Sequence, residues 1–332
     1  MELSLLGWTD DRRAQLPAGL EPARVAVDHS VGFVVYTASG ERAVQLRGKL
    51  REDRPAVGDW VGIADGAIAA VLPRTSLFAR KVPGEATRPQ AVAANVDFVL
   101  VCTAVGRDFS PRRIERYVAL AYESGASPIV VLTKTDLAED LGADLEAAQA
   151  AAPGADAHAV SRDSGFEALR AYAGGGRTLA LLGSSGVGKS TIVNGLLGEA
   201  AQAVREVRKG DDKGRHTTTA RHLFVLPEGG CVIDTPGMRE LQLWDADLDS
   251  TFPDIVALAA ACRFGDCTHR HEPGCAVQAG ADPERLESYL KLSAELAALE
   301  ARKSPKAAKE RKAAARAGSK ALRARLKDKG RS

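Results

Sequence analysis

A glycine-rich octapeptide at residues 183–190, G-S-S-G-V-G-K-S, carries the strongest chemical signal in the sequence. It matches G-x-x-x-x-G-K-[ST], in which backbone N–H groups wrap a phosphate, the lysine neutralises its charge and the last hydroxyl binds Mg²⁺. An apolar stretch at 179–182 precedes it and a helix is expected over 191–197. These flanks make a purely structural glycine turn the weaker interpretation. The nucleotide-binding residues predicted here are Gly183, Ser184, Ser185, Gly186, Val187, Gly188, Lys189, Ser190 and Thr191.

The tetrapeptide T-K-T-D at residues 133–136 resembles the N-K-x-D motif that selects guanine in GTPases, and it follows an apolar run. The Asp136 carboxylate can accept from both guanine donors, N1–H and N2–H₂, a pair that adenine lacks. Lys134 would lie along the plane of the base. Thr133 stands where the motif has Asn, and its shorter hydroxyl cannot copy the amide. We therefore expect this replacement to weaken the affinity for guanine.

Two shorter motifs complete a nucleotide site. Ser161 and Arg162 stand where GTPases carry an S-A-K-like element, whose backbone N–H contacts the guanine oxygen, and an arginine keeps that N–H. The tetrapeptide D-T-P-G at 234–237 matches the D-x-P-G switch element after another apolar strand. There Asp234 would hold Mg²⁺ through water, and the Gly237 N–H would sense the γ-phosphate.

A polar segment at 214–219, G-R-H-T-T-T, lies between the phosphate loop and the D-x-P-G element. A threonine in this interval closes over Mg²⁺ in GTPases, so Thr218 and Thr219 join Ser190 as predicted magnesium ligands. No glutamine follows the D-x-P-G element closely enough to orient the attacking water, which makes His216 the candidate catalytic residue. An edge strand and a solvent-exposed loop histidine are the structural alternatives.

The order of these motifs differs from that of an ordinary GTPase. There the phosphate loop comes first and the guanine-selecting motif fourth, whereas this chain begins the same cycle at T-K-T-D and ends at D-T-P-G. Such a circular permutation can keep one sheet and one site, because only the connections outside them change. The switch element then leads directly into the next part of the chain.

A compact group of metal-binding residue types follows the last motif. The pattern C-x₄-C-x-H-x₅-C supplies three thiolates and one imidazole from Cys262, Cys267, His269 and Cys275. Four such ligands suit a closed tetrahedral site, which predicts one structural Zn²⁺. His271 is an alternative ligand at a less familiar spacing. Five cysteines in 332 residues are too few for a disulfide framework, which favours metal ligation.

Charge is distributed unevenly along the chain. The net charge is +2, but residues 302–332 hold thirteen Lys/Arg against two Asp/Glu, which leaves 32 basic and 41 acidic residues elsewhere. A basic tail of this kind suits a polyanionic partner, and the weaker alternative is a solvated extension that aids solubility. No apolar run is long enough to span a membrane, and no secretory signal is recognisable. We expect a cytoplasmic protein, and nothing in the pattern suggests a dimer.

The elements that must position these motifs fall into three folded parts. Short strands with turn signals over 24–72 predict a small barrel of the oligonucleotide/oligosaccharide-binding (OB) type, with any small all-β domain as the alternative. Apolar strands alternating with helices then predict a doubly wound α/β domain. The expected segments are an N-terminal extension at 1–20, the OB-fold at 21–75, a linker at 76–91, a circularly permuted GTPase domain at 92–244, a mainly helical zinc-binding domain at 245–301 and a basic tail at 302–332.

Taken together, these motifs resemble those of the RsgA/YjeQ family of ribosome small subunit-dependent GTPases. The stretches V-G-D-W-V at 57–61 and A-N-V-D at 94–97 share the family's look, and the resemblance covers about 20–300. It implies binding of GTP and GDP with Mg²⁺, contacts of the barrel and zinc-binding domain with the 30S ribosomal subunit and its 16S rRNA, and GTP hydrolysis late in subunit maturation. It also implies stimulation by the subunit, release after hydrolysis and a catalytic role for His216.

Two other classes of protein compete with this interpretation. A P-loop ATPase or small-molecule kinase is supported only by Thr133, and the sequence shows no signature of an acceptor pocket or lid. A zinc-dependent nucleic-acid-binding protein that has lost hydrolysis is opposed by the intact Lys189, Ser190 and Asp234.

Overall fold

The structure is a computed structural model of the chain, and it describes residues 1–29, 32–50, 54–81, 89–198, 221–234 and 248–303. The predicted residues His216, Thr218, Thr219 and Gly237 lie outside these ranges, as does the basic tail from residue 304. Among the described helices, none is long and apolar enough to cross a membrane.

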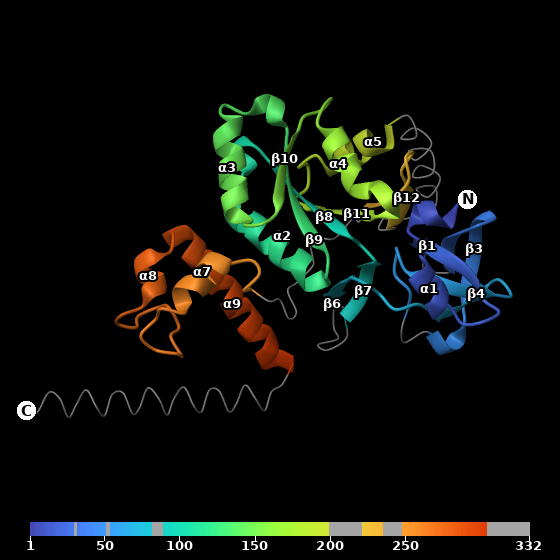
Figure 1. Cartoon of the computed structure of the whole chain (residues 1–332), viewed down its shortest axis with the longest axis horizontal. Coiled ribbons are helices and arrows are strands. Elements are labelled where there is room, and N and C mark those ends of the chain that lie inside the picture. The colour runs from blue at the N-terminus through green and yellow to red at the C-terminus, as the bar shows by residue number, and fades with distance from the viewer. Residues whose placement is uncertain (30–31, 51–53, 82–88, 199–220, 235–247, 304–332) are drawn as a thin grey trace, which may run out of the picture.

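Five short strands near the N-terminus close into a barrel (Figure 1). They pair in the order β1-β2-β3-β5-β4, and β4 returns to β1, so that no strand of the set is left at an open edge. Alternate residues point inward, and Phe33, Val35, Val61 and Ile68 are among those that fill the interior. Closure in this order identifies the OB-type barrel and removes the alternative of an unspecified all-β domain. The strands are β1 (Glu21–His29), β2 (Gly32–Thr37), β3 (Gly40–Leu46), β4 (Trp60–Ala64) and β5 (Ala67–Val71).

The central domain is a doubly wound α/β sheet. Its parallel strands run in the order β10-β9-β8-β11-β13, and β12 adds an antiparallel strand beside β13. Apolar runs buried on both faces explain why the inner strands form as predicted. The strands are β8 (Phe98–Ala104), β9 (Ser127–Thr133), β10 (Asp156–Val160), β11 (Thr178–Gly183), β12 (His222–Val225) and β13 (Cys231–Asp234).

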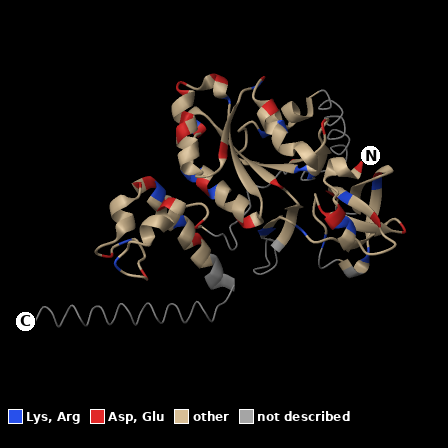
Figure 2. Cartoon of the chain, viewed as in Figure 1, with Lys and Arg blue, Asp and Glu red and all other residues tan. Residues whose placement is uncertain are grey.

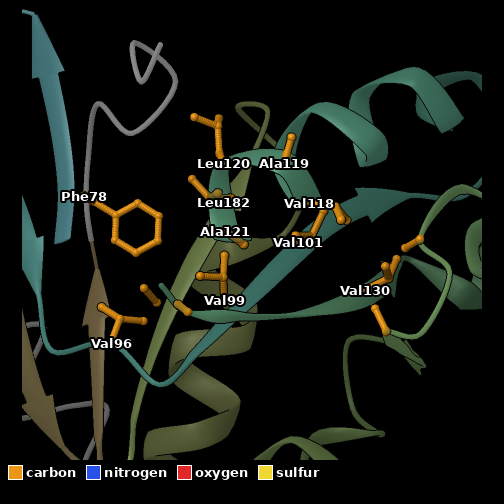
Figure 3. Close-up of a cluster of buried hydrophobic side chains, with 14 of the residues drawn as sticks. Phe78, Val96, Val99, Val101, Val118, Ala119, Leu120, Ala121, Val130 and Leu182 are labelled. Atoms are coloured by element: carbon orange, nitrogen blue, oxygen red, sulfur yellow. The ribbon is translucent and has the colours of Figure 1, made fainter. Parts of the chain in front are cut away.

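Helices cover both faces of this sheet. Successive residues of β8 point to opposite faces of the sheet. Val99 and Val101 join the buried cluster beneath α2 (Figure 3). Leu100 and Cys102 join the cluster beneath α4 and α5. Helix α2 begins with Pro111 in its first turn and ends at Ser124, and Gly125 caps it with φ of 88°. The helices are α2 (Pro111–Ser124), α3 (Leu141–Ala151), α4 (Phe166–Ala173) and α5 (Lys189–Leu197).

The barrel and the central sheet are joined by backbone pairing. Strand β1 pairs with β12 at Val27 and His222, which makes one eleven-stranded sheet of both parts. The segment expected as a linker carries a hairpin of β6 (Leu77–Lys81) and β7 (Pro89–Ala94). The N-terminal extension is also structured, with η1 (Leu3–Leu6) and α1 (Asp10–Gln15), and Leu6 is fully buried. Apolar contact and strand pairing thus extend structure into both segments.

The last folded part is a small set of helices, α7 (Pro253–Ala259), α8 (Ala276–Gly280) and α9 (Pro283–Lys303). They lie beside α2, on the opposite side of the central domain from the barrel (Figure 1). Phe252, Ile255 and Val277 belong to the same buried cluster as residues of α2. Helix α9 runs to Lys303, slightly beyond the predicted boundary at 301.

Candidate nucleotide and metal sites

The phosphate-binding loop connects the carboxyl end of β11 to the start of α5. Gly183 and Gly188 have φ of 154° and 104°, a region that side chains rarely adopt. A Cβ at Gly183 would also approach the carbonyl oxygen of Cys102 to 2.6 Å. These glycines are therefore required by the turn itself and by its close approach to strand β8.

Lys189 lies across the mouth of this loop. Its ammonium donates to the carbonyl oxygens of Gly183 and Ser184 at 2.8 and 2.7 Å. Ser190 and Thr191, in the first turn of α5, are exposed to solvent. The arrangement leaves the side chains expected to meet phosphate and Mg²⁺ at an accessible surface, at the N-terminus of a helix.

Thr133, the departure from the guanine motif, has a structural task. Its side chain is buried, and its hydroxyl lies 2.5 Å from the carbonyl oxygen of Val187 and 3.2 Å from that of Thr103. The single hydroxyl proton is donated to one of them at a time. The contact with Val187 ties the end of β9 to the phosphate-binding loop, so the threonine braces the loop that holds the phosphates.

The two segments predicted to recognise guanine lie next to each other. Strands β9 and β10 are parallel and place Thr133 opposite Val160, so Lys134 and Ser161 follow at the same edge of the sheet. Lys134 adopts a left-handed conformation with φ of 56°, and Asp136 is exposed. Ser161 and its neighbours form a turn in which the Ser161 N–H donates to the carbonyl of Ser164 at 3.1 Å.

Asp234 ends β13 at the edge of the sheet where the phosphate-binding loop begins. The register of β11 with β13 places Ala180 beside Ile233, which brings the carboxyl ends of these two strands together. Because carboxyl ends of parallel strands meet at one edge, Asp234 belongs to the same side of the sheet as Gly183 and Lys134. The structure therefore brings together, at one edge, predicted residues from 133 to 234.

The four predicted metal ligands converge on one point. Their ligating atoms all lie within 4.8 Å of one another. The His269 Nδ1 atom is 3.7 Å from Cys262 Sγ and 3.5 Å from Cys275 Sγ, and these two sulfurs are 3.9 Å apart. Tetrahedral Zn²⁺ places two thiolates about 3.8 Å apart and a thiolate and an imidazole about 3.5 Å apart, given its usual bond lengths. The donor set and its spacing fit that ion.

The two histidines proposed as alternative ligands differ in burial and in what their rings face. His269 is buried at a left-handed φ of 58°, and its ring nitrogen faces the thiols. His271 is exposed and is not among the clustered ligands. The interpretation that favoured His269 over His271 agrees with this geometry.

Sequence reasoning missed Arg113, which the fold brings to the phosphate-binding loop. Its Nη1 lies 3.4 Å from the Ser184 hydroxyl oxygen. In the sequence it is one of several arginines on a predicted helix, and the helical period alone cannot distinguish it from its neighbours. Only the strand order, which places β8 beside β11, brings the start of α2 to the loop.

Comparisons with known proteins agree on one family. A sequence model of the family described as RsgA GTPase matches residues 71–244. The "Small ribosomal subunit biogenesis GTPase RsgA 2" of Lactiplantibacillus plantarum is 45% identical over an alignment of length 293 that covers 82% of each chain. The "Small ribosomal subunit biogenesis GTPase RsgA" of Opitutus terrae is 46% identical over an alignment of length 332 that covers 90% of each chain.

Solved structures show the same architecture. The crystal structure of YjeQ from Thermotoga maritima matches with a TM-score of 0.63 and 27% identity, over 83% of this chain and 98% of that one. The structure described as YloQ, a circularly permuted GTPase, matches with a TM-score of 0.58 and 24% identity, over 84% of this chain and 96% of the other. The second match bears on the fold alone.

Proposed function

Because this chain belongs to the RsgA GTPase family, we propose that it binds the small (30S) ribosomal subunit and hydrolyses GTP there late in the subunit's maturation. It is a GTPase of small-subunit biogenesis, a GTP hydrolase that yields GDP and phosphate. The observation that carries the proposal is the shared edge of the sheet, where the phosphate-binding loop, the guanine motif and Asp234 meet. The subunit would stimulate turnover, and hydrolysis would release the protein from it.

Each residue of the nucleotide site has a proposed task. The backbone of 183–190 would surround the β-phosphate, and Lys189 would leave the carbonyls of Gly183 and Ser184 to neutralise phosphate charge. Ser190, one of Thr218 and Thr219, and Asp234 through water would hold Mg²⁺. That ion neutralises charge shared between the β- and γ-phosphates.

Guanine recognition is assigned to the neighbouring loops. Asp136 would accept from guanine N1–H and N2–H₂, Lys134 would lie along the base, and the Arg162 N–H would donate to the guanine oxygen. The brace from Thr133 to Val187 keeps this side of the pocket in register with the phosphate-binding loop. The threonine that replaces the usual asparagine therefore still links the guanine-recognition loops to the phosphate-binding loop.

Hydrolysis requires a group that orients water, and His216 is proposed for it. The residue lies outside the described ranges, as do Gly237 and the threonines of 217–219. A partner that positions His216 beside the γ-phosphate would raise turnover. The permuted order also places the D-T-P-G switch directly before the C-terminal helices, so loss of the γ-phosphate would be transmitted to them.

The remaining parts suit binding to RNA. The OB-type barrel and the basic tail would contact 16S rRNA, with the tail releasing counterions from phosphates. One Zn²⁺ held by Cys262, Cys267, His269 and Cys275 would be structural, because a closed set of four protein ligands leaves no position for substrate. We place the protein in the cytoplasm as a monomer.

The test is phosphate release from GTP and from ATP, each with and without purified small ribosomal subunits. Slow GTP turnover that rises strongly only with small subunits is expected. Turnover that ignores the subunit would contradict the ribosomal assignment and leave a GTPase with another partner. Equal activity on ATP would contradict the guanine assignment, and Lys189→Ala, which removes the phosphate lysine, gives the background rate.

A further inference from the structure

Three arginines in the first turns of α2 have different surroundings. Arg112 donates to Glu287 at 2.5 Å, and Arg116 donates to both carboxylate oxygens of Glu295 at 2.5 and 2.9 Å. Both glutamates belong to α9 of the C-terminal domain. These two arginines are therefore occupied in holding that domain to α2.

The Arg113 side chain points toward the phosphate-binding loop instead of toward α9. Its Nη1 donates to the Ser184 hydroxyl at 3.4 Å and to the Asp108 carbonyl at 3.5 Å, both long hydrogen bonds. Within the described part of the chain, no carboxylate forms an ion pair with it. Its guanidinium is half-buried against the loop and meets only neutral oxygens there.

Two cations thus converge on one residue of the phosphate-binding loop. The Lys189 ammonium contacts the carbonyl oxygen of Ser184 at 2.7 Å, and the Arg113 guanidinium contacts its side-chain hydroxyl. Like charges brought to one place repel each other unless an anion lies near both. Nucleotide phosphates are the anions for which this loop is built.

We propose that Arg113 is a positioning residue of the nucleotide site, which acts through Ser184 to hold the phosphate-binding loop and adds positive charge beside it. This inference rests on the proposed GTPase function. The charge acts most on the ligand with the most negative charge, so GTP binding depends on Arg113 more than GDP binding does. Because it supports the bound phosphates before and during reaction alike, it lowers KM and leaves kcat nearly unchanged.

The experiment measures KM and kcat for GTP, and Kd for GDP and for a slowly hydrolysed GTP analogue, in the full chain. In Arg113→Ala we expect KM for GTP to rise about tenfold, the size of one lost charge-assisted contact, with kcat within about twofold. Affinity for GDP should fall by a smaller factor. Arg113→Lys keeps the charge and should recover part of the loss.

Arg112→Ala is the matched control, since it removes the same charge from the neighbouring position but its partner is Glu287. Ser184→Ala tests the route, because the double variant Arg113→Ala/Ser184→Ala should lose less than the two single losses combined. Additive losses would overturn the action through Ser184. The proposal is also overturned if Arg113→Ala behaves as Arg112→Ala, or if it loses kcat and melting temperature together.

Failure of the underlying function looks different. If the unchanged protein and Lys189→Ala bind GTP equally poorly, the GTPase assignment fails and the role of Arg113 fails with it. If Lys189→Ala abolishes binding while Arg113→Ala has no effect on GTP, only the inference about Arg113 is wrong.

Discussion

The central domain is attached to its two neighbours in physically different ways. On the barrel side, β1 and β12 share backbone hydrogen bonds, and the fully buried Arg24 of β1 donates to the Asn95 carbonyl at 3.2 Å and the Thr178 hydroxyl at 2.6 Å. On the other side, α2 and α9 meet through charged side chains as well as apolar ones. Figure 2 marks the basic and acidic positions along the ribbon. One attachment is built of backbone pairing and buried neutral acceptors, the other of apolar contacts together with ion pairs.

The barrel side is fixed by directional contacts. Arg24 also donates to the Leu6 and Gly58 carbonyls and lies over the Trp60 ring at 5.3 Å. Asn95, at a left-handed φ of 54°, donates its amide to the same Gly58 carbonyl at 3.1 Å. Such contacts cannot be remade after a shift of one residue. The stretches 57–61 and 94–97, which carry part of the family resemblance, thus build this attachment.

The other side is suited to adjustment. The pairs of Arg112 with Glu287 and of Arg116 with Glu295 are partly exposed, and long charged side chains keep contact over small displacements. Among the residues that the structure describes, one buried ion pair, Arg285 with Glu115 at 2.9 Å, joins the two parts. We therefore expect movement between α2 and the C-terminal helices α7 to α9 rather than between the barrel and the central sheet. The D-T-P-G motif directly precedes these helices in the sequence.

The largest effect should come from removing the predicted metal ion, which should destabilise the C-terminal helices and leave the barrel side unchanged. Binding of a structural Zn²⁺ contributes about 10 kcal/mol to the folding of a small domain. Cys275→Ser or a strong chelator should unfold α7 to α9 while the barrel and central sheet persist. Amide hydrogen exchange measures this, and unchanged protection of α9 after metal loss would contradict it.

Arg24→Met breaks the barrel side and should have the next largest effect. It leaves the Leu6 and Asn95 carbonyls and the Thr178 hydroxyl without the Arg24 donor, whereas the Gly58 carbonyl keeps the amide of Asn95. The free energy of unfolding should fall by about 4 kcal/mol. Urea denaturation followed by tryptophan fluorescence measures the loss. Arg42→Met, whose pair with Glu21 is exposed, is the control and should change little. Equal losses in both variants would refute the distinction.

Arg285→Met tests the buried ion pair with Glu115 between α9 and α2. It leaves Glu115, whose side chain is 3% exposed, without its cation, at an expected cost of about 3 kcal/mol. The cost should be smaller than for Arg24 because Glu115 can take up a proton. Melting of the C-terminal helices, followed by circular dichroism, measures it. A loss larger than that of Arg24→Met would reverse the ranking of the two attachments.

The pH dependence sharpens the role of Arg285. Burial raises the pKa of Glu115 above its ordinary 4.5, so its contribution to stability is present at lower pH and is lost as pH rises through the folded value. Burial also acts to raise the pKa of Asp254, but hydrogen bonds and charge from Arg285 outweigh it and hold the pKa below 3.8. Its contribution is present above that value and is lost as pH falls.

The two carboxyl groups should therefore respond oppositely when neutralised. As pH rises from 3 to 7, the melting temperature of Glu115→Gln should increase relative to that of the unchanged protein. Over the same range, the melting temperature of Asp254→Asn should decrease relative to it. If both variants changed the melting temperature in the same direction across this range, the opposite pKa shifts assigned to Glu115 and Asp254 would be wrong.

The smallest effect is expected from Glu295→Gln, which weakens a half-exposed pair with Arg116. Such pairs contribute at most about 1 kcal/mol, and about 1 M salt screens charges beyond roughly 3 Å. The difference from the unchanged protein should shrink as NaCl is added, in thermal melts of the C-terminal helices. A difference that is independent of salt would show that packing, not charge, holds this turn of α9.

Local elements were largely predictable, and the exceptions have physical reasons. The buried strands β8, β9 and β11 and helix α2 follow from continuous apolar runs and end signals. The strands β10 and β12 and the hairpin β6–β7 were missed, because D-A-H-A-V and similar short stretches carry little pattern of their own. They become strands because a neighbouring strand offers hydrogen bonds.

The local chemistry of this protein can be read from its sequence: the glycines that allow a phosphate-binding turn, the spacing of four metal ligands, and the order of motifs that marks the permutation. These features depend on short stretches of chain, so a linear pattern reveals them. Folding of the whole chain is what brings Thr133 to Val187 across 54 residues, joins three segments at Arg24, and turns Arg113 toward the phosphate-binding loop. Those contacts depend on strand order, which one linear pattern does not specify.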